Sequence, residues 1–130
     1  MPHVTQAART IAAFAVLTVI LSGCFPESKI VQPVGVWSES TDANSPSLSL
    51  HEDGSVTGFD GCNQLTGAWE PTDNGVNFKQ LASTQVACPD VDTWLDGAIE
   101  ATISMDTMTV SGLNDEEIGT LQRTAQTPAE

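Results

Sequence analysis

The sequence predicts a mainly β domain of the α+β class, built as a small, curved antiparallel sheet with one helix near the C-terminus. About seven short segments alternate apolar with polar residues and are separated by turn residues at hairpin spacing. A single stretch, residues 90–103, has helical periodicity instead. A twisted sheet of this many strands tends to curl or close, because closure removes its exposed edges.

The N-terminus has the features of an export signal. A polar start carrying Arg9 precedes the apolar run "IAAFAVLTVIL" at 11–21. This run is shorter than the roughly 20 apolar residues of a bilayer span and suits the core of a secretory signal. It ends in "LSGC", which resembles the lipobox of bacterial lipoproteins. The alternatives are an ordinary cleaved signal or a lone membrane helix with a chance cysteine.

The lipobox resemblance implies a processed, lipid-anchored protein. Residues 1–23 would be the signal peptide, and Cys24 would be acylated and become the first mature residue. The protein would then sit on the extracytoplasmic face of the cell membrane. Residues 24–33 lack periodicity and are expected to form a tether, 34–124 the domain, and 125–130 a loose tail.

The strand signals follow one another from Gly35. Val36 and Trp37 mark the first expected strand, in "GVWSES". In "PSLSLHEDGSVTGF" two leucines alternate with serines, and Asp53-Gly54 favours a hairpin turn because glycine tolerates positive φ. Similar patterns predict further strands around Trp69, at 76–81, at 83–87, at 107–111 and at 118–123. Leu48 with Leu50, Val76 with Phe78 and Met108 with Val110 are each expected to share a face.

The predicted helix covers residues 90–103, after Pro89. Asp90 can cap its start and Asp92 suits its positive end. Its expected apolar side contains Val91, Trp94, Leu95, Ala98, Ile99 and Thr102, opposite Asp92, Asp96 and Glu100. Gly97 weakens such a helix by about 1 kcal/mol relative to alanine, so packing would have to compensate.

The charge balance excludes a class of partner. The chain has 17 acidic residues and 4 basic ones, for a formal net charge of −13. Nucleic-acid binding needs a basic patch that neutralises phosphates, and none is present. Anionic headgroups would also be repelled, so membrane attachment is expected through the acyl anchor on Cys24.

Three cysteines are present, and Cys24 is assigned to the lipid. Cys62 and Cys88 remain, and an exported domain meets oxidising conditions in which thiols tend to pair. A disulfide is therefore expected. Two free thiols are the main alternative. A nucleophilic cysteine is the weakest, because catalysis needs a nearby base and the mature chain has a single histidine, His51.

No motif for catalysis, cofactor binding or metal binding is found. Zinc needs three or four ligands, which one histidine and two paired cysteines cannot supply. Asp60 and Glu70 are a conceivable carboxylate pair, but nothing in the sequence brings them together. Trp37 and Trp69 are expected in the core rather than in a cleft, and Asn63 is expected to support a turn. We therefore expect no enzyme, no cofactor and no metal.

Two blocks of the sequence resemble the META domain family, of the heat-shock HslJ-like type. The first is "FDGCNQLTGAW" (59–69) and the second "NFKQLASTQVACP" (77–89). The resemblance covers about 34–124 and implies a lipocalin-like barrel or half-barrel with a helix, paired cysteines and no catalytic residues. The chain departs from the family pattern at Gln85, where a basic residue is common, and in the shorter segment after Pro89.

Two functions follow as hypotheses. The first is a non-enzymatic, membrane-anchored protein of the cell envelope, acting in envelope stress or in contacts with other envelope proteins. The second is a binder of a lipid or other apolar small molecule inside the curved sheet. A hollow barrel lined by tryptophan and phenylalanine would favour the second hypothesis, and a filled core with exposed apolar side chains would favour the first.

Overall fold

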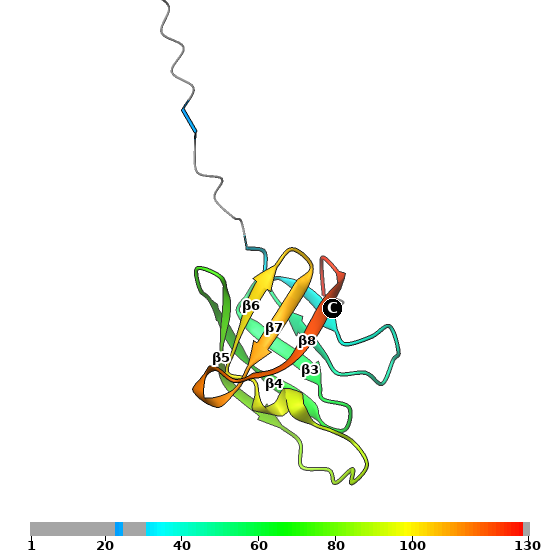
Figure 1. Cartoon of the computed structure of the whole chain (residues 1–130). Helices are drawn as coiled ribbons and strands as arrows, with labels where there is room; N and C mark the ends of the chain where they lie inside the picture. The colour runs from blue at the N-terminus through cyan, green and yellow to red at the C-terminus, as the bar shows by residue number, and fades with distance from the viewer. Residues whose placement is uncertain (1–22, 25–30, 129–130) are drawn as a thin grey trace, which may run out of the picture.

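The domain is a closed, eight-stranded antiparallel barrel (Figure 1). The computed structural model describes residues 23–24 and 31–128. The strands are β1 (Gly35–Ser38), β2 (Ser47–Leu50), β3 (Ser55–Phe59), β4 (Gln64–Pro71), β5 (Gly75–Ser83), β6 (Glu100–Ser104), β7 (Thr107–Ser111) and β8 (Glu117–Ala125). Two short 3-10 helices, η1 (Trp94–Gly97) and η2 (Leu113–Asp115), lie in the connections.

Each strand pairs with its neighbours in chain order, and the first and last strands close the ring. Across the closure Trp37 pairs with Arg123 and Ser38 with Gln122. The mainly β prediction is confirmed, and the sheet closes fully where a curved sheet or half-barrel was expected. Closure satisfies the backbone groups of β1 and β8 that an open sheet would leave exposed.

Alternating side chains fill the interior. The predicted inward pairs, Leu48 with Leu50, Val76 with Phe78 and Met108 with Val110, are all buried. They share one core with these residues: Trp37, Val56, Leu65, Leu95, Ala98, Ala101, Ile103 and Leu121. At about 25 cal/mol per Å² of apolar surface removed from water, this burial is the main stabilising contribution.

The predicted helix at 90–103 is wrong. Only Trp94–Gly97 is helical, as the short η1, and Ala98 is already extended. Val91 and Ile99, from the expected apolar side, are 40% and 42% exposed. From Glu100 the chain is β6, which pairs with both β5 and β7.

The reason for this error is a nonlocal competition for backbone hydrogen bonds. The Ile99 N–H donates to the Ser111 carbonyl over 2.9 Å, and the Ile99 carbonyl accepts from Phe78 N–H over 2.8 Å. Such pairing between distant strands outweighs a weak helical preference. Within β6 the buried residues, Ala101 and Ile103, are two apart as in any strand.

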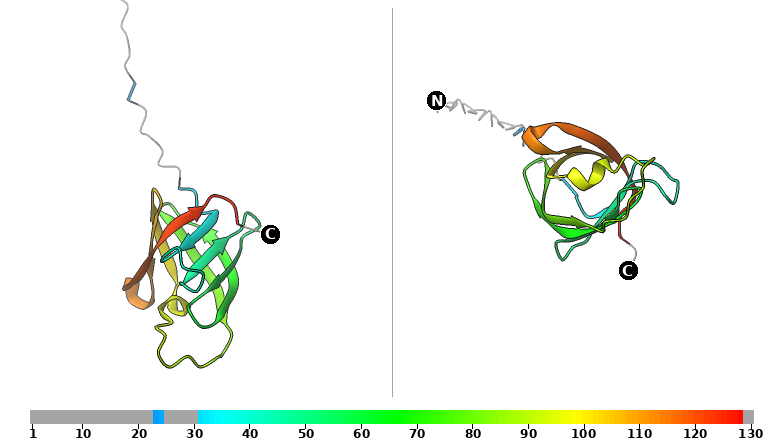
Figure 2. Two further views of the ribbon diagram at one scale, coloured as in Figure 1. Left: turned by 90° about the vertical axis from the view of Figure 1, so that its right-hand side faces the viewer. Right: turned by 90° about the horizontal axis from the view of Figure 1, so that it is seen from below.

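Helix η1 closes one end of the barrel. Seen from below in Figure 2, it lies across the barrel opening, and its Leu95 is fully buried. The Trp94 ring packs on Gly119 of β8 so closely that a Cβ there would lie 2.6 Å from the ring. Glycine at position 119 is therefore required by this contact.

The up-and-down topology gives the barrel two different ends. We call one the tether end: it consists of residues 31–34 with the turns at 51–54, 72–74 and 105–106. We call the other the loop end: it consists of the connections at 39–46, 60–63, 84–99 and 112–116. In Figure 1 residues 31–34 join the barrel at the top, and the long loop before η1 lies at the bottom.

Candidate functional site

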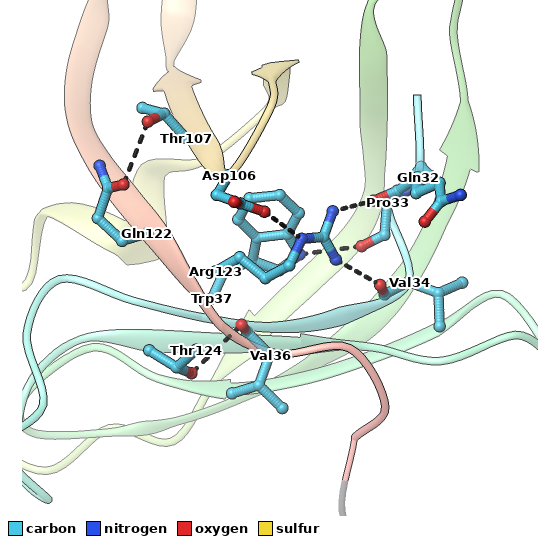
Figure 3. A network of polar contacts seen from close by, with 10 residues as sticks. All are labelled: Gln32, Pro33, Val34, Val36, Trp37, Asp106, Thr107, Gln122, Arg123 and Thr124. Atoms are coloured by element: carbon cyan, nitrogen blue, oxygen red, sulfur yellow. Dashed lines mark hydrogen bonds and ion pairs between the residues drawn. The ribbon is translucent and has the colours of Figure 1, made fainter. Parts of the chain in front are cut away.

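At the tether end, Arg123 of β8 binds the segment that enters the barrel (Figure 3). Its guanidinium donates to the carbonyl of Val34 over 2.8 Å and also to the carbonyl of Gln32. Its Nε lies 3.2 Å from a carboxylate oxygen of Asp106. The side chain of Arg123 is 5% exposed, so this cation is held almost entirely by the protein.

Trp37 completes the contact from inside the barrel. The Arg123 guanidinium carbon lies 4.1 Å from the centre of the Trp37 ring, a distance suited to a cation–π interaction. The indole N–H of Trp37 donates to the Pro33 carbonyl over 2.9 Å. Residues 32–34, of which 32 and 33 were assigned to the tether, are thus hydrogen-bonded to the barrel.

Arg123 was not among the functional residues predicted from the sequence. The available signal was its spacing from buried Leu121, because residues two apart in a strand face the same way. An isolated arginine on the inward face of a strand, in so acidic a chain, is a candidate for a buried anchor.

At the loop end, a disulfide joins the β3–β4 turn to the long loop before η1. Cys62 and Cys88 are bonded, with their Cα atoms 6.0 Å apart, and the predicted disulfide is confirmed. Cys62 is therefore not a free thiol. Cys24 is exposed and outside any disulfide. The acylation expected there stays a prediction, and the signal peptide expected at 1–23 lies almost wholly outside the described residues.

Asn63 pins the same loop through its amide. Its Oδ1 accepts from the Val86 N–H over 2.7 Å and from the Thr84 hydroxyl over 3.0 Å, while its Nδ2 donates to the Val86 carbonyl over 3.2 Å. The side-chain amide of Asn63 thus bonds both the N–H and the carbonyl of Val86, as the backbone of a neighbouring strand would. Asn63 was expected to support a turn, and its carbonyl does accept from the Asp60 N–H over 3.1 Å within the β3–β4 turn. Its side chain in addition holds the long loop.

Asp60 organises the turn that carries Cys62. It is fully buried, and its Oδ1 accepts from the backbone N–H groups of Cys62 over 2.8 Å and Asn63 over 2.6 Å. Gly61 between them has φ +98°, a conformation that favours glycine. The other carboxylate oxygen of Asp60 is buried without a partner among the described residues.

The structure does not assemble the remaining candidates into a catalytic or metal site. A carboxylate oxygen of Glu70 lies 3.4 Å from Lys79 Nζ. Asp60 instead accepts hydrogen bonds within the β3–β4 turn. His51 Nε2 lies 3.3 Å from the Thr57 hydroxyl. Among residues 23–24 and 31–128, no group of three or more His, Cys, Asp or Glu side chains is placed to hold a metal ion.

Five hollows among the described residues open at the ends of the barrel or on its outer surface, and neither Trp37 nor Trp69 lines any of these five. Trp37 is in the core, and Trp69 packs against it while donating to the His51 carbonyl over 3.0 Å. One hollow, of about 450 Å³, opens at the loop end beside Trp94.

One carboxylate has a clearly altered pKa. The hydroxyl of Ser55 donates to Asp53 over 2.6 Å, and the Ser55 N–H donates over 2.9 Å. These hydrogen bonds, the hydroxyl first, hold the pKa of Asp53 below its ordinary value of 3.8. Asp53 is fully exposed in the β2–β3 turn, where this arrangement stabilises the hairpin.

The comparison with family models gives a match over residues 32–126, to the META domain. The chain belongs to the META domain family. The matched range begins at Gln32, whose carbonyl accepts a hydrogen bond from Arg123, and ends just after β8. It therefore includes the whole barrel. No match was found among curated proteins or among solved structures.

Within this META domain, the described residues contain no helix long and apolar enough to cross a membrane. The two motif blocks that carry the family resemblance meet in space at the loop end. The Cys62–Asn63 block contacts the Thr84–Cys88 block through the disulfide and the Asn63 amide. These two blocks therefore hold the long loop before η1 in place.

Proposed function

We propose that this META domain is a lipid-anchored, non-enzymatic protein of the cell envelope that contacts a protein partner through its loop end. The observation that carries the proposal is the difference in contacts between the two ends of the barrel. Arg123 holds the incoming chain at one end. The disulfide and Asn63 hold an exposed loop at the other.

The loop end is acidic. The four connections of the loop end contain no lysine, arginine or histidine. Their exposed acidic residues are Glu39, Asp42, Asp90, Asp92, Asp96, Asp115 and Glu116, whereas Asp60 is buried. Complementary charge speeds association and selects partners. The surface therefore suits a partner with a basic face.

Apolar side chains accompany the acids. Val86 and Leu113 of the loop end are 61% and 74% exposed, although a small domain gains stability by burying such residues. A rigid loop that presents apolar side chains loses little entropy on binding. The filled interior supports surface contact over binding of an apolar ligand inside the barrel.

The anchor would keep the barrel close to the bilayer. Six residues lie between Cys24 and Val31 in the sequence, and seven residue-to-residue steps span at most about 25 Å. Because the chain enters at the tether end, the loop end would be directed away from the lipid.

Two experiments test the proposal. Labelling cells with a palmitate analogue should mark the wild-type protein and not the Cys24→Ala variant; equal labelling would refute the lipid anchor. A photo-crosslinking amino acid at position 86 or 113 should form a protein adduct in cells. The same group at Met105, which is exposed on the tether end, serves as the control. Adducts from 105 but not from 86 or 113 would overturn the assignment of the partner surface.

A further inference from the structure

The hollow at the loop end combines apolar walls with carboxylates. Its lining includes the apolar residues Trp94, Val91 and Pro46 and the acidic residues Glu39, Asp90 and Asp92. The volume is about 450 Å³, which is ample for one long side chain. Three connections distant in sequence, 39–46, 60–63 and 84–99, form it together.

Within the part of the chain that the structure describes, none of the three carboxylates forms an ion pair. The two ion pairs of the described residues join Lys79 to Glu70 and Arg123 to Asp106, and neither touches this hollow. Glu39, Asp90 and Asp92 are exposed, so they remain solvated in the free protein. A cation placed among them would be attracted by all three.

The hollow is also held in place. Trp94 is packed against Gly119 of β8, and the backbone of Val91 hydrogen-bonds to the carbonyl of disulfide-bonded Cys88 over 3.1 Å. A Cβ at Gly61 would lie 3.0 Å from Val91, so the turn and the loop are in close contact. A site built on such a support needs little rearrangement to bind.

We infer that this hollow receives a lysine or arginine side chain of the protein partner. The methylene stem would lie along Trp94, Val91 and Pro46, and the charged head would reach the carboxylates, as amphipathic cationic side chains do. An aspartate or glutamate would be repelled by the same rim. The inference rests on the proposed partner contact and specifies the chemistry of one anchor residue.

Nuclear magnetic resonance on the full chain in a neutral detergent tests the inference directly. The probe is N-acetyl-arginine amide, and N-acetyl-citrulline amide is its uncharged counterpart of nearly equal shape. The arginine probe should shift the Trp94 indole and the amides of 90–94 with millimolar affinity, and the citrulline probe should bind at least about fivefold more weakly. Equal binding of both probes, or no shift at these residues, would overturn the inference.

Matched charge variants sharpen the test. Asp90→Asn with Asp92→Asn should weaken binding of the arginine probe by about 2- to 20-fold. Glu52→Gln with Asp73→Asn removes the same charge from the tether end and should leave the affinity within about twofold. An equal loss in both pairs would show general attraction to an acidic protein and would reject a specific site. All four positions are exposed, so the variants should fold.

The two levels of the proposal can fail separately. Photo-crosslinking from position 86 in the Asp90→Asn, Asp92→Asn background reports on the partner contact. If the adduct forms at the wild-type level there, the partner contact stands and the cationic anchor residue is refuted. If no adduct forms from 86 or 113 in the wild type, the partner surface itself is refuted, whatever the probe does.

Discussion

The guanidinium of Arg123 lies over the ring of Trp37, 4.1 Å from its centre, while both side chains hydrogen-bond to the segment that precedes β1. Trp37 belongs to β1 and Arg123 to β8. This one pair therefore links barrel closure, the core and the incoming chain. Arg123 is the point at which the domain and its N-terminal segment are joined.

Replacing Arg123 by glutamine should lower the free energy of unfolding by about 2–3 kcal/mol. The loss follows because charge-assisted hydrogen bonds to two carbonyls disappear and those carbonyls are left without this donor. Urea unfolding measures it. Lys79→Gln is the control, since its ion pair with Glu70 is exposed and should contribute less than about 1 kcal/mol. Equal effects at the two positions would contradict the anchoring role.

Gly119 and Gly97 provide a matched pair for the packing of Trp94. Gly119→Ala should destabilise the domain by about 1–3 kcal/mol, because the new methyl would collide with the indole 2.6 Å away. Gly97→Ala should be neutral or slightly stabilising, because the nearest atom is 3.9 Å from the new Cβ. Thermal unfolding of both variants checks the contrast, and a tolerated alanine at 119 would show that η1 does not pack on β8.

Reduction of the Cys62–Cys88 bond should lower the free energy of unfolding by about 2–5 kcal/mol, because the unfolded chain is no longer cross-linked. Hydrogen exchange at 84–92 should rise on reduction. Asn63 continues to hold Val86, so exchange at Val86 should rise least.

The matched experiment removes the amide instead. In Asn63→Ala with the disulfide intact, exchange should rise most at Val86. Intact mass of the Cys24→Ala protein after alkylation confirms the starting state: no alkylation without reductant, and two additions after reduction. Two additions in never-reduced protein would show that the pair is free.

The hydrogen bonds from Ser55 to Asp53 predict a pH effect. A lowered folded-state pKa means that this contribution to stability is present above the unfolded value and is lost as pH falls through the folded value. Ser55→Ala should raise the pKa of Asp53 toward 3.8 and reduce the pH dependence of stability below about pH 4. Carboxyl NMR titration measures the pKa. Ser49→Ala is the control and should leave the Asp53 pKa unchanged.

Local patterns in the sequence were sufficient for most strands. Leu48 and Leu50 alternate with serines, and the Asp53-Gly54 turn brings back β3, so both the strands and their hairpin follow from near neighbours. The cysteine count likewise led to the Cys62–Cys88 bond. These features depend on side-chain period and turn chemistry, which a short window contains.

Tertiary structure decided what depends on contacts between distant residues. The sequence of residues 98–104 could place its apolar side chains on one side of a helix. Backbone pairing with β5 and β7 makes this segment extended instead. Arg123 is a buried anchor only because closure of the barrel brings β8 beside β1 and the chain before it. The loop-end hollow exists only because 39–46, 60–63 and 84–99 meet there. Pairing and closure are nonlocal, and their energies therefore cannot be found in any single stretch of the chain.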